Sequence, residues 1–118
     1  MVTLPRASYR IARQVEGRGS FADVSVGDSA ELDPSQLTGT PPAWLAAAER
    51  GIHAALAAMG LRAPQVALLR VIYTHVDTDE DTVHAAAFMA TARSFAREQQ
   101  FRLVRRDGRW CVVPAEPA

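Results

Sequence analysis

The stretch SYRIARQVEGRGSFADVSV, residues 8–26, decides the fold that we predict for this chain. In its first half, apolar side chains at Tyr9, Ile11 and Val15 alternate with polar ones, which is typical of a strand with one face in water. The second half alternates in the same way. The four residues EGRG between the halves supply the glycines that tight turns favour. The stretch therefore predicts a β-hairpin, and its turn is either a plain turn or a place where exposed backbone and an arginine contact a ligand.

The segments that follow predict two helices and one further strand. Residues 42–59 carry apolar side chains three and four positions apart and are followed by Gly60, a residue that often ends a helix. Residues 65–73, QVALLRVIY, are mostly apolar and predict a strand in a sheet covered on one face. Residues 82–100 predict the second helix, because acidic residues precede it and arginines lie toward its end.

A second hairpin is predicted near the end of the sequence. Asp107 and Gly108 separate two strand-like runs within residues 101–113, and Asp-Gly is a favoured two-residue hairpin turn. We expect a single domain over residues 1–118, with a core at 8–98 and this hairpin added. The predicted fold class is α+β, a two-layer sandwich of about four strands with two helices on one face.

The composition limits the classes of function. The chain has 118 residues, 48% of them apolar, and a formal net charge of zero, which argues against a general polyanion binder. All its basic residues are arginine, which we interpret as a GC-rich, bacterial coding sequence. Cys111 is the only cysteine, so no internal disulfide forms and a reducing cytoplasm is the expected location. No stretch has the apolar length of a signal peptide or membrane span, and we expect no membrane contact.

A calcium loop is the sharpest metal-site hypothesis, and the sequence argues against it. Asp77, Asp79 and Asp81 match the opening of such a loop, but Thr82 stands where glycine is required and Phe88 where glutamate is required. We interpret the carboxylates at the start of the second helix as favourable to its N-terminus. The expected set of catalytic residues, metals and cofactors is empty, and the chain is not expected to be an enzyme.

Three segments resemble domain IV of elongation factor G and of the related ribosomal protection proteins. GRGSFADV at 17–24 is similar to the glycine-rich hairpin of that family, and AAERGIHAAL at 47–56 is similar to its first helix. VDTDEDTVHAAAFMA at 76–90 is similar to its V-D-S-S-E turn and alanine-rich helix. The three lie in register, and the likeness covers about residues 9–97.

The resemblance implies four strands, two helices and a left-handed βαβ crossover, although the general rule for such connections is right-handed. It also implies that the 14–20 and 73–78 loops lie together at one end, which in the family enters the ribosomal decoding site beside transfer RNA and messenger RNA. The implied ribosome- or RNA-contacting residues are Gln14, Glu16, Gly17, Arg18, Gly19, Ser20, Thr74, His75 and Asp77.

The sequence also departs from that family. It lacks the phosphate-binding pattern G-x-x-x-x-G-K-[ST], so it is not expected to hydrolyse GTP. The family's histidine before the V-D-S-S-E turn is replaced by Thr74, with His75 one position later. The final hairpin is unlike the family and carries a basic cluster that either discourages strand aggregation or holds phosphate or an acidic partner. That cluster comprises Arg102, Arg105, Arg106 and Arg109.

We therefore expect a non-catalytic binding domain whose partner is the ribosome or structured RNA. The alternative is a protein-interaction or oligomerisation module that keeps the fold without ribosome binding, with a protein partner or a second copy of the chain docked on an apolar patch around Phe101 and Trp110.

Overall fold

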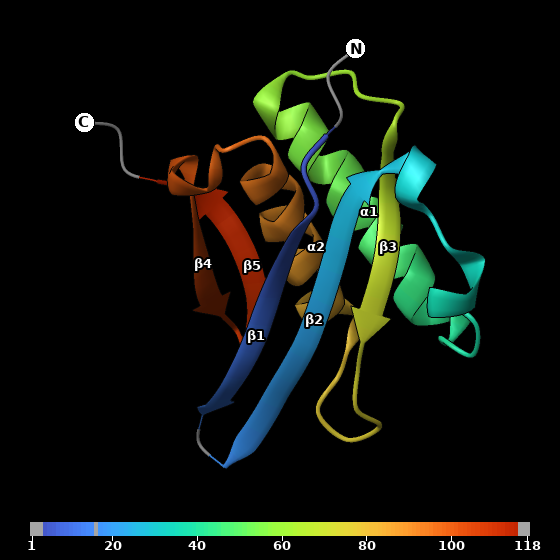
Figure 1. Ribbon diagram of the computed structural model, residues 1–118. Helices are drawn as coiled ribbons and strands as arrows, with labels where there is room; N and C mark the ends of the chain where they lie inside the picture. The colour runs from blue at the N-terminus through green and yellow to red at the C-terminus, as the bar shows by residue number, and fades with distance from the viewer. Residues whose placement is uncertain (1–3, 16, 116–118) are drawn as a thin grey trace.

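The computed structural model describes residues 4–15 and 17–115 and shows an α+β protein with two helices and two antiparallel sheets. Three short 3-10 turns lie in its connections, at Ser29–Glu31, Pro34–Gln36 and Glu98–Gln100. The elements follow in the order β1 (Ala7–Val15), β2 (Arg18–Asp28), α1 (Pro42–Met59), β3 (Val66–Ile72), α2 (Glu80–Ser94), β4 (Phe101–Arg106) and β5 (Arg109–Pro114), as Figure 1 shows. Among the described residues, no helix is long and apolar enough to span a bilayer.

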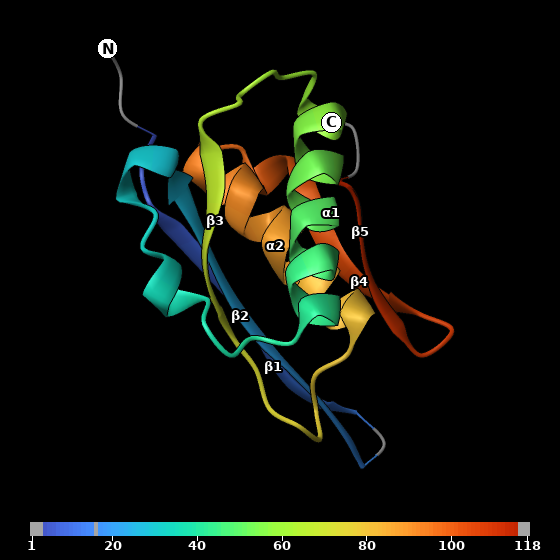
Figure 2. The ribbon, with the colours of Figure 1, turned by 90° about the vertical axis from the view of Figure 1, so that its right-hand side faces the viewer.

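The five strands belong to two separate sheets. The larger sheet has the order β1-β2-β3, and β4 pairs only with β5. The larger sheet thus has three strands rather than the four expected, because the final hairpin packs on α2 instead of adding a strand beside β1. The βαβ unit of the predicted order is β2–α1–β3, whose two strands are antiparallel neighbours in the larger sheet, so the handedness rule for crossovers between parallel strands does not apply to it. Both helices cover the same face of the larger sheet (Figure 2).

The core lies between this sheet and α2, which is the central helix. Ile11, Val24 and Val26 point inward from the sheet and are at most 1% exposed, as their alternation with polar residues predicts. Most of α2 is buried, because it contacts β1, β2, β5 and α1. Its run of alanines lets these neighbours approach closely, and α1 meets it through small residues that include Gly51.

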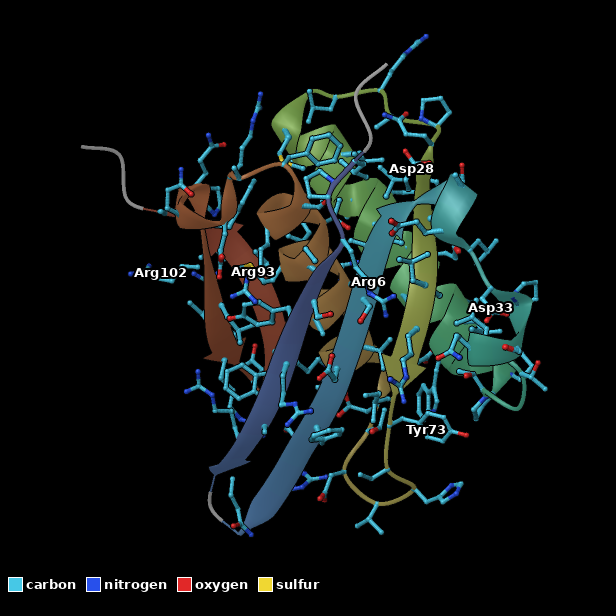
Figure 3. The ribbon with its side chains drawn as sticks, viewed as in Figure 1. Arg6, Asp28, Asp33, Tyr73, Arg93 and Arg102 are labelled. Atoms are coloured by element: carbon cyan, nitrogen blue, oxygen red, sulfur yellow. The ribbon has the colours of Figure 1, made fainter. Side chains whose placement is uncertain are left out.

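The observed ends of α2 correct the prediction of a helix over 82–100. The helix ends at Ser94, and Ala96 takes a left-handed conformation with φ of 57°. Arg93 holds the turn that follows, because its Nε donates to Glu98 at 2.8 Å while its Nη1 donates to the Ser8 carbonyl of β1 at 2.6 Å (Figure 3). The chain thereby reverses into β4 instead of continuing as helix.

The other predicted boundaries are close to those observed. The first helix occupies Pro42–Met59, and Gly60 ends it with φ of 67°. Asp107 and Gly108 have φ of 52° and 76°, the double positive φ of a tight hairpin turn, so the second hairpin is confirmed. In the first hairpin β2 begins at Arg18, two residues earlier than expected.

Candidate functional site

Two loops that are distant in sequence lie side by side at one end of the larger sheet. Figures 1 and 2 show the first residues of β2 next to the loop of residues 73–79, which connects β3 to α2. The backbone N–H of Phe21 donates to the Asp77 carbonyl at 2.8 Å, and the Thr78 hydroxyl donates to the Phe21 carbonyl at 2.7 Å. The loop therefore continues the pairing of β2 beyond the end of β3. We call these two loops together the tip.

Hydrogen bonds from threonines fix the shape of the 73–79 loop. The Thr74 backbone N–H donates to the Thr78 hydroxyl at 2.8 Å, and the Asp77 N–H donates to the Thr74 hydroxyl at 2.9 Å. The Asp79 carboxylate then caps α2, since it accepts from the N–H of Thr82 at 2.8 Å and from its hydroxyl at 2.7 Å. This cap supports the interpretation that the acidic run serves the helix N-terminus. No group of three His, Cys, Asp or Glu side chains in the described part of the chain is placed to hold a metal ion.

Asp77 lines two hollows in the surface of the tip. One has a volume of about 380 Å³, and its lining includes Gln14, Gly19, Phe21 and Asp77. The other has a volume of about 360 Å³, and its lining includes Arg18 and Asp77. A Cβ at Gly19 would lie 2.6 Å from Asp77 Oδ1, so only glycine admits the carboxylate here. That carboxylate makes no hydrogen bond or ion pair with any other described residue.

The residues singled out for the tip divide into surface and support. Gln14, Gly17, Arg18 and His75 are exposed, and His75 lies edge-on to the Tyr73 ring at 5.8 Å. Ser20 is buried, and Thr74 is partly buried and bonded within its loop, so both support the tip instead of forming its surface. Glu16 lies outside the described residues. Of the residues singled out from the sequence, the surface of the tip therefore includes Gln14, Gly17, Arg18, Gly19, His75 and Asp77.

Sequence reasoning missed two residues of this surface. Phe21 lines the larger-sheet side of the tip, and Val76 is 89% exposed. The alternation in β2 carried the signal for Phe21, because Ala22 and Val24 point inward and an aromatic residue beside them must face water. No pattern in the loop marks Val76, whose exposure follows from the hydrogen bonds around it.

The four arginines of the final hairpin do not form one patch. Arg106 and Arg109 are cross-strand partners on one face, whereas Arg105 points to the other, where its Cζ lies 5.3 Å from the centre of the Trp110 ring. Arg109 is 3.6 Å from the Asp81 carboxylate, which offsets its charge. Arg102 shares the face of Arg106, because the two residues are four positions apart on β4. The register thus divides the basic cluster that the sequence suggested.

The apolar patch expected around Phe101 and Trp110 is covered. Phe101 packs edge-to-face on Phe88 with ring centres 4.9 Å apart. Trp110 is partly buried against the core, and Arg13 approaches its ring to 6.0 Å. The large apolar side chains that are exposed among the described residues are instead Leu32 and Val76.

His84 on α2 makes the folding stability dependent on pH. Its burial, and secondarily the charge of Arg50, lowers the pKa of His84 below its ordinary value. As pH falls through about 6.5, the unfolded chain takes up a proton at this site that the folded chain resists, so stability is lost toward acid. We expect His84→Gln to reduce the slope of unfolding free energy between pH 7 and pH 5, measured by urea denaturation. The control is His53→Gln, on the exposed side of α1. If both variants showed the same slope of unfolding free energy against pH as the parent protein, this role of His84 would be contradicted.

No protein-family model matches the chain, and no curated protein is significantly similar to it. Its function is therefore inferred from the geometry of the tip together with the resemblance in sequence.

Proposed function

We propose that this chain is a non-catalytic binding domain that contacts the ribosome or structured RNA through its tip. The observation that carries the proposal is the convergence of the β1–β2 turn and the 73–79 loop, which hydrogen bonds between Phe21, Asp77 and Thr78 fix at the end of the sheet. Binding residues are often placed on loops that a rigid scaffold positions.

The chemistry of the tip suits a short contact with nucleic acid. Gly17 and Gly19 let the backbone approach a ligand closely, and the exposed Arg18 supplies a cation for one phosphate. Asp77 and Asp79 line the same hollow as Arg18, so the local charge is mixed. We therefore expect recognition by shape with few phosphate contacts, and weak, salt-sensitive association.

A protein-interaction or oligomerisation module is the alternative, and one observation favours it. An apolar hollow of about 550 Å³, lined in part by Leu56, Leu61 and Pro64, lies at the C-terminal end of α1. The C-terminal end of α1, which carries the lining residue Leu56, lies at the other end of the molecule from the tip (Figure 1). The alternative and the proposal thus place the binding surface at opposite ends.

Substitution of Arg18 by alanine tests the proposal. We expect Arg18→Ala to weaken co-sedimentation with ribosomes and to reduce the dependence of log affinity on log salt by about one, because one phosphate contact is lost. The matched control is Arg62→Ala, since Arg62 is also exposed but belongs to the connection between α1 and β3 at the opposite end. Absence of ribosome and RNA binding at low salt, together with a stable dimer by light scattering, would reject the proposal in favour of the alternative.

A further inference from the structure

One face of the larger sheet carries no helix (Figure 2), and the strand register places the side chains of this face in rows across the strands. Each row crosses the strands, and successive rows follow one another from the far end of the sheet toward the tip. Neighbouring rows are about 7 Å apart, since each is two residues further along a strand. The rows are Ser8–Ser25–Arg70, Arg10–Asp23–Ile72, Ala12–Phe21 and Gln14–Gly19. Phe21 is the aromatic residue of this face, and it stands in the row next to the tip.

The two sides of Phe21 differ. Toward the middle of the sheet, the Arg10 guanidinium lies 5.7 Å from the ring centre and is held by Asp23 at 2.9 Å. Toward the tip, the next position on β2 is Gly19, which has no side chain, and the 380 Å³ hollow opens there. The hollow therefore has an aromatic ring as one wall and glycine backbone nearby.

The hollow is also lined by a hydrogen-bond acceptor that has no partner among the described residues. The Asp77 carboxylate lies against Gly19 and is bonded to no other described residue. A carboxylate accepts hydrogen bonds and donates none when ionised. Gln14 adds an amide group that both donates and accepts. The hollow thus combines a stacking surface with a group that selects N–H donors.

We propose that this hollow receives an unpaired guanine base of RNA, stacked on Phe21 with its Watson–Crick edge toward Asp77. This assignment rests on the proposed function, because the base belongs to RNA that the tip contacts. Unpaired bases are commonly stacked on aromatic side chains and read through their Watson–Crick edges. Guanine presents two adjacent N–H donors there, which match the two oxygens of a carboxylate.

The other bases fit this carboxylate less well. Adenine and cytosine place an acceptor nitrogen beside their amino group, and uracil flanks its single N–H with carbonyl oxygens, so each turns a lone pair toward the carboxylate. Arg10 and Arg70 lie on the same face of the sheet, where their guanidinium groups can contact the phosphates of the neighbouring nucleotides. The ligand is therefore a guanine within a single strand, and a free nucleotide lacks these additional contacts.

Fluorescence anisotropy with labelled single-stranded RNA tests the assignment. The probes are uridine heptamers whose central base is guanine, 7-deazaguanine, inosine or adenine. We expect guanine and 7-deazaguanine to bind equally, and inosine and adenine about tenfold more weakly, because inosine lacks the amino group and adenine has an acceptor nitrogen beside its amino group instead of a second donor. Equal binding of guanine and inosine would overturn the assignment. Guanosine monophosphate bound as tightly as the guanine heptamer would overturn the assignment to RNA.

Three variants assign the effect to particular side chains. Asp77→Asn is expected to remove the preference for guanine over inosine, whereas Phe21→Leu is expected to weaken every heptamer by about 5- to 100-fold. Glu31→Gln, which removes a carboxylate from an exposed 3-10 turn outside the tip, is the control and leaves both quantities unchanged. A guanine preference that survives Asp77→Asn in a folded variant would reject the role of the carboxylate.

Ribosome co-sedimentation of the parent protein and of Arg18→Ala, together with the anisotropy measurements, separates the two proposals. Ribosome binding that depends on Arg18, with no preference for the guanine heptamer, would overturn the base assignment alone. Absence of both ribosome and RNA binding by the parent protein would overturn both.

Discussion

The variant Gly51→Val is expected to lower the free energy of unfolding by about 3 kcal/mol, and Gly51→Ala by about 1 kcal/mol. A Cβ at this position would lie 2.4 Å from the His84 carbonyl oxygen and 2.8 Å from the Ala87 Cβ. The carbonyl belongs to the backbone of α2, so the two helices must separate to admit even one methyl group. Guanidinium denaturation measured by circular dichroism gives the free energies.

The sign of the Gly51→Ala effect makes this prediction specific. Alanine is the better helix former by about 1 kcal/mol, so a helix without close neighbours would gain stability from the change. The control is Ala46→Gly in α1, where the side chain is exposed and the loss should be about 1 kcal/mol. Greater stability of Gly51→Ala than of the parent would show that α1 and α2 are not in close contact at this glycine.

Local patterns were sufficient to predict most of the elements. Alternation of apolar and polar residues predicted the first hairpin, and apolar residues three and four positions apart predicted α1. Each pattern indicates an element that packs one apolar face on the core. The end of α2 was predicted wrongly because Arg93 interacts with Glu98 and with the distant Ser8, and no local pattern reveals a contact with β1. The sheet was given one strand too many for a similar reason, since only tertiary packing decides whether the final hairpin lies on α2 or beside β1.

The candidate site was predictable to a smaller extent. The likeness in sequence placed the 14–20 and 73–78 loops at one end, and the structure has them there. It did not identify Phe21 or show that the Asp77 carboxylate lies against Gly19, because both facts depend on the register between β2 and a loop more than fifty residues away. The same register divides the terminal arginines between two faces.

The tip depends on one hydroxyl group, and its removal should have a large effect on stability. Thr78 is 8% exposed, and its hydroxyl donates to the Phe21 carbonyl and accepts from the Thr74 N–H. Thr78→Val keeps the shape of the side chain but leaves both groups without this partner. Since a buried polar group without a partner costs about 1–3 kcal/mol, we expect a loss of about 2–3 kcal/mol in urea unfolding. Amide hydrogen exchange at Thr74 should accelerate in parallel.

A threonine elsewhere provides the control for this variant. The Thr38 hydroxyl donates to the Pro34 carbonyl at 3.1 Å but is exposed, so water replaces the lost bond and Thr38→Val should cost less than about 0.5 kcal/mol. Equal losses for Thr38→Val and Thr78→Val would contradict the supporting role of Thr78. Because Thr78 joins the Phe21 strand to the loop that carries Asp77, its substitution should also reduce the preference for guanine under conditions in which the protein remains folded. A loosened loop no longer holds the carboxylate against Gly19 in the hollow that Phe21 lines, and the free energy of ordering the loop would then oppose binding.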